Sequence, residues 1–336
     1  MIYSLHVYRA FAALLIVFFH ANMYMDDHFY TNRLTLLFEF GNFAVQFFFV
    51  LSGFIVYYNH KNDIGVSKKI SIFIKKRFMR IYPVYWLAVL VHSFKLFMFD
   101  NYNSLKIEFL PLISGLLLIG GEPPITIAWT LVHEIIFYLF FGLLILSKKV
   151  GSIVFIIWQV IILTLNIPSQ DIYNEFGFLF SCNNLLFGFG MIACFLALKF
   201  EGLIKKRGIW FFLTGNLIFL SALLGFLKEF LPFFHSRVLL AGFASFLIVL
   251  GSMDNMVESL FKKNQFILFL GTASYSIYLI HGVGIPFTGA FIDYLKIINS
   301  NTLIYFIMTT MAVLAGVLFY CFIEAPVYSW LKKKTM

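Results

Sequence analysis

The chain has 336 residues, of which 61% are hydrophobic and only 12% are charged, and its formal net charge is +9. A soluble domain has roughly 45–50% apolar and about 25% charged residues, so this composition excludes a water-soluble globular protein. Lipid offers no partners to unpaired backbone groups, so the apolar runs are predicted to be helices. We therefore predict an all-α polytopic membrane protein in which residues 1–336 form a single transmembrane domain.

About ten transmembrane helices are predicted. The first apolar run is interpreted as a retained span, because no small-residue cleavage site of a signal peptide follows it. Each run can cross most of a hydrocarbon core that is about 30 Å thick. In chain order, the predicted spans are 7–25, 41–60, 82–99, 128–147, 151–167, 178–198, 209–228, 233–250, 266–290 and 303–323.

The distribution of charge predicts the orientation of these spans. Most of the 25 basic residues fall on alternate loops and on the C-terminal tail, and most acidic residues outside the spans fall on the opposite loops. The positive-inside rule then makes the basic loops and both termini cytoplasmic. The excess positive charge is explained by topology, so no nucleic-acid partner is expected.

Residues 109–120 are apolar but short for a span, and Gly120–Gly121 and Pro123–Pro124 follow at once. Counting this segment as a span would invert every later loop and place the lysines outside. We therefore interpret it as an external re-entrant or interfacial piece.

Arg9 and His20 are ionisable residues within the first predicted span. Such a residue costs about 2.5–3.5 kcal/mol at a helix centre, and it usually faces a cavity or a partner. Their spacing corresponds to about 1100° of helix rotation and a rise of about 16 Å, which puts both on nearly the same face. Each alone also fits a structural role, Arg9 reaching the headgroups and His20 bonding within the bundle. The shared face favours a common cavity, with Arg9 at its cytoplasmic end.

Arg77 and Arg80 lie three residues apart, just before the third predicted span. Pro83 suits the first turn of that helix, and the aromatic residues beside it, Tyr82, Tyr85 and Trp86, suit the membrane interface. The arginines fit ordinary positive-inside charge. They also fit a cytoplasmic anion clamp, because guanidinium groups match phosphate oxygens.

Two further spans carry polar residues. Glu134 lies about a turn and a half inside the fourth span, where a carboxylate is expected to be neutral or paired with a cation such as a histidine. Ser274, Tyr278 and His281 form one polar stripe on the ninth span, which fits interhelical hydrogen bonds as well as a site. In the second span, the triplet Ser52, Gly53 and Phe54 permits close helix approach, but a serine without a nearby base is an unpromising nucleophile.

Five segments, taken in order, resemble the acyltransferase-3 family of membrane acyltransferases over nearly the whole chain. The matching segments are R-x10-H from Arg9 to His20, VQFFFVLSGF at 45–54, RFMRIYP at 77–83, AWTLVHEIIFY at 128–138 (which includes Trp129) and SYSIYLIH at 274–281. The fourth segment and RIYPVYW look most like sugar O-acetyltransferases of the exopolysaccharide and O-antigen types. Family members often carry an additional C-terminal extracytoplasmic domain, whereas this chain stops soon after its tenth predicted span.

The resemblance implies an O-acyltransferase in the bacterial cytoplasmic (inner) membrane. It implies transfer of an acyl group, usually acetyl from cytoplasmic acetyl-CoA, to a carbohydrate at the outer face, with no metal. His20 matches the essential histidine of the family and Arg9 its companion arginine, while Arg77 and Arg80 match its RxxR motif. Ser52, Gly53 and Phe54 match its SGF motif, and Trp129, Tyr278 and His281 fall within matching segments.

The chemistry is compatible with this resemblance. The phosphates of coenzyme A would stay near Arg77, Arg80 and Arg9, and the pantetheine arm would carry the thioester toward His20. The imidazole would then be a general base on a sugar hydroxyl or would itself be acylated. Glu134 would orient that histidine, stabilise its charge or bind the acceptor.

A polysaccharide exporter or a lipid-linked sugar flippase is the alternative function. It would also need many spans and a polar pathway, but it does not require a cytoplasmic arginine pair linked to a histidine deep in the membrane. Glycan composition separates the two, because loss of an acyltransferase leaves polymer without acyl groups, whereas loss of an exporter leaves little polymer.

Overall fold

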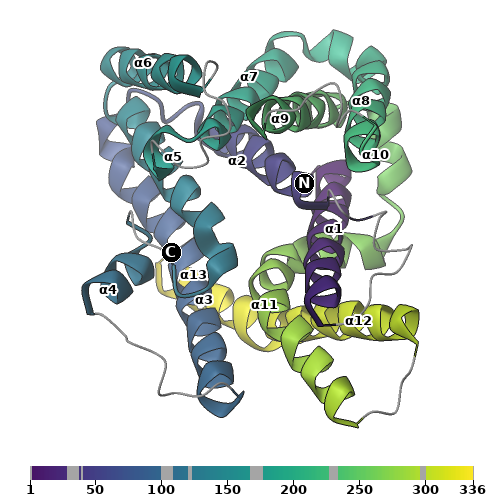
Figure 1. The fold of residues 1–336 in the computed structure, drawn as a ribbon. Helices are drawn as coiled ribbons and strands as arrows, with labels where there is room; N and C mark the ends of the chain where they lie inside the picture. Colours follow the sequence, from purple (N-terminus) through teal and green to yellow (C-terminus); the bar gives the residue numbers. More distant parts are fainter. Residues whose placement is uncertain are drawn as a thin grey trace. The chain divides into compact units, whose positions relative to one another are not determined.

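The structure is a computed structural model that describes residues 2–28, 38, 41–99, 109–119, 123–166, 177–226, 234–295 and 300–335. These residues are almost entirely helical, and no strand occurs among them (Figure 1). The α-helices are α1 (Tyr3–His28), α2 (Ala44–His60), α3 (Ile70–Phe99), α4 (Phe109–Leu117), α5 (Trp129–Leu146), α6 (Lys148–Asn166), α7 (Leu185–Lys199), α8 (Glu201–Leu223), α9 (Phe234–Gly251), α10 (Asn255–Phe261), α11 (Gln265–Leu295), α12 (Asn301–Phe319) and α13 (Ala325–Thr335).

Seven helical segments among the described residues are long and apolar enough to cross a membrane. They are Tyr3–His28, Gly41–His60, Thr126–Leu146, Lys148–Asn166, Cys182–Lys199, Gln265–Leu295 and Asn301–Lys334. An eighth results if α9 and α10, which meet at a 91° bend, form one span. The predicted count of ten is therefore not confirmed. Of the remaining predicted spans, those on α3 and α8 follow several lysine and arginine residues, which shorten the apolar part of each helix.

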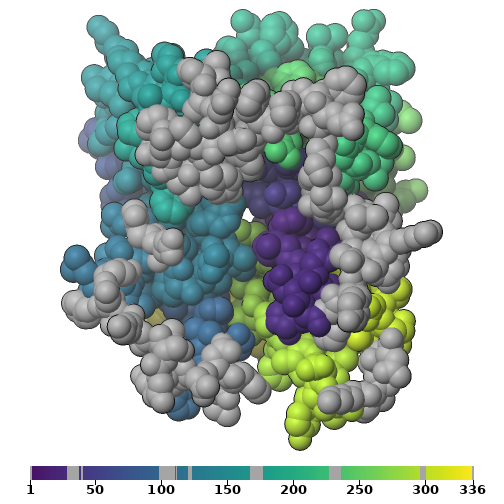
Figure 2. Space-filling view, in the orientation of Figure 1, coloured from purple at the N-terminus to yellow at the C-terminus, as the bar shows by residue number. Residues whose placement is uncertain are grey.

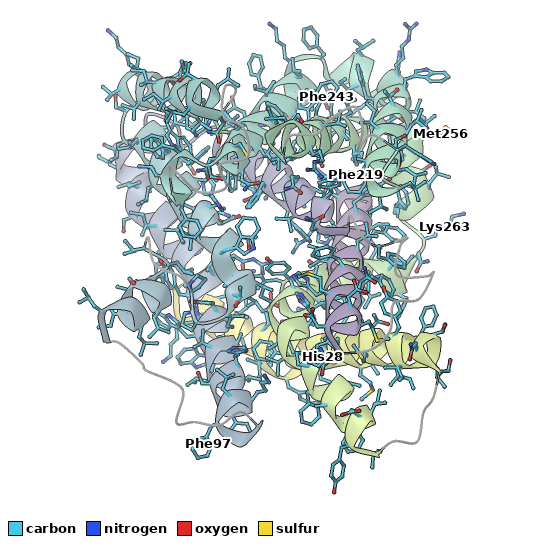
Figure 3. The ribbon with its side chains drawn as sticks, in the orientation of Figure 1. His28, Phe97, Phe219, Phe243, Met256 and Lys263 are labelled. Carbon is cyan, nitrogen blue, oxygen red and sulfur yellow. The ribbon has the colours of Figure 1, made fainter. Side chains whose placement is uncertain are left out.

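Many large apolar side chains point away from the helices. Phe97 on α3 is 62% exposed and Met256 on α10 is 61% exposed, and both point outward in Figure 3. A water-soluble monomer rarely exposes extensive apolar surface, so this distribution fits a protein surrounded by lipid.

The chain forms two compact units, and the boundaries between them fall inside several helices. Unit 1 comprises Met1–Ala12, Phe40–Phe73 and Ile136–Thr272, and unit 2 comprises Ala13–Glu39, Ile74–Ile135 and Ala273–Met336. The two units are described separately below.

Unit 1 is built on α2, α7, α8 and α9, which pack closely on one another. A Cβ atom on Gly53 of α2 would overlap the carbonyl oxygen of Phe187, and one on Gly190 of α7 would overlap that of Val50. Small residues thus let the α2 and α7 backbones touch, as in many membrane helix pairs. Phe219 of α8, labelled in Figure 3, packs against a small apolar cluster formed by Phe43, Ala222 and Ala241.

The first turn of α1 is capped by a residue from far along the chain. The Glu258 carboxylate on α10 accepts hydrogen bonds from the backbone N–H groups of Tyr3 and Ser4, and from the Ser4 hydroxyl at 2.8 Å. Helix N-termini leave such N–H groups without intrahelical partners, and their positive dipole end favours a carboxylate. Asp254 caps α10 in the same way through Met256 and Val257, immediately after the bend.

In unit 2, three aromatic side chains on α3 cap the C-terminus of α4. The Tyr82 hydroxyl donates to the Leu117 carbonyl at 2.7 Å, the Tyr85 hydroxyl to Gly115 at 2.9 Å and the Trp86 indole to Leu116 at 2.9 Å. These carbonyls are the acceptors that a helix C-terminus leaves unused. The aromatic residues interpreted from the sequence as interfacial therefore also fix α4, which is far too short to span a membrane, as expected for this segment.

The C-terminal helices of unit 2 pack on the second half of α1. The Tyr305 hydroxyl on α12 donates to the Phe18 carbonyl at 3.0 Å, and Gly316 of α12 brings its backbone against Ile277 of α11. Figure 2 shows the purple atoms of α1 beside the yellow-green atoms of these helices. Between α12 and α13 the helix widens into a π-helical turn at Tyr320–Glu324.

One helix start was wrongly predicted. We expected Pro83 in the first turn of a helix beginning near 82, but α3 begins at Ile70 and Pro83 lies inside it. The reason is that residues 70–81 contain Lys75, Lys76, Arg77 and Arg80 among apolar residues, a mixture that suits a helix but not a span. Parts of other predictions, namely residues 120–121, 167, 227–228 and 233, lie outside the described residues.

Candidate functional site

A pair of histidine rings is the central feature of unit 2. His20 comes from α1 and His281 from α11, and the His281 Nε2 atom lies 3.2 Å from the His20 Nδ1 atom. The ring centroids are 4.9 Å apart. His281 is 0% exposed and His20 is partly buried. The structure thus brings together two residues that are 261 positions apart, both of them predicted site residues.

The neighbouring carbonyls decide which nitrogen donates. The His281 Nδ1 atom faces the Ile277 carbonyl at 3.3 Å, so it carries the hydrogen and leaves Nε2 as an acceptor. The His20 Nδ1 atom faces the Ile16 carbonyl at 3.0 Å and His281 Nε2, both acceptors, so it carries a hydrogen that both share. This tautomer, assigned from the hydrogen-bond network, leaves His20 Nε2 with a lone pair.

Tyr278 holds α11 at the level of the histidine pair. Its hydroxyl donates to the Ile127 carbonyl at 2.6 Å. Because its single hydrogen is used there, the Thr130 hydroxyl donates to the Tyr278 oxygen at 3.0 Å. Tyr278 and Ser274, two members of the predicted polar stripe, are both buried, and Tyr278 ties α11 to the start of α5.

An ion pair between α3 and the π-helical turn contacts α11 at Ser276, about one and a half turns before His281. Arg80 on α3 donates to the Glu324 carboxylate at 3.0 Å, and the Ser276 hydroxyl donates to its other oxygen at 2.6 Å. The Arg80 guanidinium also stacks over the Tyr275 ring at 5.3 Å. Glu324 closes the π-helical turn and is only 3% exposed, whereas Arg80 is 36% exposed. Helix rise gives about 7.5 Å between the Ser276 and His281 positions.

The ion pair was missed from the sequence. Glu324 is a lone acidic residue at the end of an apolar span, and we grouped it with no motif. A usable signal was present, because a carboxylate at the end of an apolar span needs a cation partner. The predicted clamp residue Arg80 is that partner, so its charge is already balanced within the protein.

The other predicted residues of unit 2 lie on the expected helices. Arg77 is half-buried on α3, one turn before Arg80. Glu134 is half-buried on α5, and the Trp129 ring packs edge-on against His133 at 5.5 Å. The His20 Nδ1 atom lies within hydrogen-bond distance of the Ile16 carbonyl and of His281 Nε2, so a histidine of α11 is a ring partner of His20, while the role of Glu134 stays a prediction.

The remaining predicted residues belong to unit 1. Arg9 is half-buried on α1, the continuous helix that also carries His20. Gly53 and Phe54 of α2 are buried, and Gly53 lies against the α7 backbone. In this unit Gly53 and Phe54 of the triplet therefore contribute to helix packing.

No group of three or more His, Cys, Asp or Glu side chains within the described ranges could hold a metal ion. A family model described as an acyltransferase domain, of the acyltransferase-3 family, matches residues 2–321. No curated protein and no solved structure matches the chain.

Proposed function

The chain belongs to the acyltransferase-3 family of membrane acyltransferases, and we propose that it moves an acetyl or other acyl group from cytoplasmic acyl-CoA to a carbohydrate hydroxyl. The acceptor is a cell-surface or lipid-linked glycan at the outer face of the bacterial cytoplasmic membrane. With about ten spans and both termini inside, α1 would run from the donor side to the acceptor side.

The observation that carries this proposal is the 3.2 Å contact between His20 Nδ1 and His281 Nε2, because the tautomer assigned from it leaves a lone pair on His20 Nε2. A general base must accept a proton from the attacking hydroxyl and return it to the leaving group. In the proposed step, Nε2 takes the proton of the sugar hydroxyl as its oxygen attacks the thioester carbonyl. The carbon–sulfur bond then breaks, and the imidazolium returns the proton to the thiolate of coenzyme A.

The same nitrogen also suits a two-step reaction. In that case Nε2 attacks the thioester carbonyl itself, the carbon–sulfur bond breaks and coenzyme A leaves as the thiolate. The sugar hydroxyl then attacks the acyl carbon, the acyl–nitrogen bond breaks, and the hydroxyl proton that is released balances the thiolate as thiol. Both routes need His20 Nε2 unprotonated, so the tautomer supports either. A burst of free coenzyme A before product appears would favour the acyl-enzyme route.

The donor end is proposed to lie at the cytoplasmic ends of α1 and α3. Coenzyme A is polyanionic, and Arg77 and Arg9 bring positive charge to these helices. We propose that Arg9, Arg77 and Arg80 each contribute positive charge that favours binding of the donor phosphates, and that the ion pair with Glu324 fixes the position of the Arg80 guanidinium.

The test is transfer of labelled acetyl from acetyl-CoA to an acceptor glycan by purified protein, with mass spectrometry of surface glycans in parallel. We expect His20→Ala to abolish transfer while the protein remains inserted and folded. Arg77→Ala is the matched comparison: it should raise the KM for acetyl-CoA several-fold and change kcat less, because binding and chemistry are separated.

Full transfer activity in purified His20→Ala would contradict the catalytic assignment. Surface glycans that keep all their acyl groups but fall sharply in amount in cells lacking the protein would instead indicate an exporter.

A further inference from the structure

We infer that His281 is a positioning residue for the reaction, one that holds His20 in the tautomer and orientation that expose Nε2. This inference rests on the proposed function, in which His20 Nε2 carries out the chemistry. A hydrogen bond joins the two rings, and each ring is also held by a carbonyl of its own helix.

The acceptor that His281 offers is fixed in its own place. Its Nδ1 hydrogen is directed to the Ile277 carbonyl one turn earlier on α11, so its Nε2 points toward α1 as an acceptor. The ring is fully buried, and three residues earlier Tyr278 anchors α11 to Ile127. A buried polar group that is hydrogen-bonded on both sides has little freedom to reorient.

The Ile16 carbonyl alone holds the His20 ring less firmly. That carbonyl lies in the same helix as His20, four residues earlier, and it also accepts in the helical ladder. His281 supplies an acceptor from a different helix, which fixes the ring from outside α1. The same acceptor can stabilise the positive charge that forms on His20 when Nε2 takes a proton.

A separate hydrogen bond, one that does not involve the His20 ring, anchors α1 to its neighbour α12. The Tyr305 hydroxyl binds the Phe18 carbonyl, two residues before His20, and so joins α1 to α12 without touching the imidazole. Losing that bond should loosen α1 as much as losing any single interhelical bond. Tyr305→Phe is therefore the matched control for a purely structural role of His281.

The kinetic experiment compares His281→Leu, His281→Gln and Tyr305→Phe, all checked for folding by thermal melting in detergent. We expect His281→Leu to lower kcat about 10- to 100-fold, a part of what a general base contributes, with the KM for acetyl-CoA almost unchanged. His281→Gln keeps an acceptor near the Nε2 position and should recover much of that loss. Tyr305→Phe should keep kcat within about twofold of the unmodified protein, since it leaves general-base chemistry intact.

A second measurement does not depend on activity. Nitrogen-15 NMR of histidine-labelled protein distinguishes the two neutral tautomers, and His20→Ala identifies the His20 signal. We expect the Nδ1–H form in the unmodified protein and a mixture in His281→Leu. An unchanged His20 tautomer in His281→Leu, or a His281→Gln variant no more active than His281→Leu, would overturn the inference. Absence of transfer by the unmodified protein, with the tautomer shift present, would instead refute the proposed function alone.

Discussion

At the scale of single residues, unit 2 places two kinds of polar contact along one stretch of α11. The histidine pair uses neutral rings and backbone carbonyls, while the Arg80–Glu324 pair uses full charges. Removing a charge from water is costly in a membrane protein. Loss of one partner of a buried ion pair is therefore destabilising, because the other charge is left uncompensated. This difference allows the stability of the ion pair to be tested apart from the chemistry of His20.

Glu324→Gln should destabilise the protein by about 1–3 kcal/mol, because Arg80 loses its charged acceptor and Ser276 a strong one. The expected loss of stability is modest because Arg80 is 36% exposed and solvent partly screens its charge. Thermal unfolding in detergent measures the loss. Combining Glu324→Leu with Arg80→Leu should cost less than the sum of the single changes, since neither charge is then left alone.

Glu201→Gln is the control for the ion pair. Glu201 accepts from Lys205 at 2.6 Å within the same helix, but both residues are exposed. An exposed ion pair contributes little to stability, so this change should leave the unfolding temperature unchanged. Equal losses from Glu201→Gln and Glu324→Gln would show that burial adds nothing to the Arg80 pair.

At the scale of helices, apolar runs predicted most of the elements. The boundaries were harder to predict, because a hydropathy average finds an apolar span and loses an amphipathic helix that leads into it. For this reason the predicted span began at residue 82, whereas α3 begins at Ile70. The bend before α10 and the π-helical turn at Glu324 were also missed, since neither changes the local composition. The pairing of His20 with His281 needed the fold, because no spacing rule links positions that far apart.

The close contact between the α2 and α7 backbones at Gly53 can be tested by substitution. Gly53→Ala should destabilise unit 1 by about 1–3 kcal/mol, because the new methyl group would overlap the Phe187 carbonyl and the helices would have to separate. Gly202→Ala on α8 is the matched control, because its Cβ would enter open space. It should stabilise the helix slightly. Melting curves of both variants, compared with that of the unmodified protein at similar expression levels, measure the two changes in stability.

If Gly53→Ala melted like the unmodified protein, the close α2–α7 contact would be absent in the membrane. The Ser52–Gly53–Phe54 triplet would then need a role other than packing, and acyl transfer by Ser52→Ala would be the measurement to make next.

At the scale of the whole molecule, family and composition agree on a multi-pass membrane acyltransferase. The single domain and the ten spans stay predictions from the apolar runs, and the cytoplasmic termini stay a prediction from the charge distribution. The orientation of the helices in the membrane follows from the excess of lysine and arginine in cytoplasmic loops. Contacts between helices are the same in either orientation, so they do not reveal it.

Cysteine labelling tests the orientation. In a Cys321→Ser background, which removes the exposed cysteine, Asp27→Cys at the end of α1 should react with a membrane-impermeant maleimide on intact cells. Lys205→Cys on α8 should react only after permeabilisation, because the positive-inside rule puts its loop in the cytoplasm. The reverse labelling pattern would invert the proposed path from donor to acceptor.

The cap on α1 has a consequence for how the protein is assembled. During synthesis α1 leaves the ribosome well before α10, yet the carboxylate that accepts from the N–H groups of its first turn belongs to Glu258, a residue made 254 or 255 positions later. Early in synthesis the start of α1 must therefore rely on water or headgroups for these bonds. Its final anchoring waits until α10 has been translated, so a chain cut before residue 258 would insert α1 without securing the helix that carries His20.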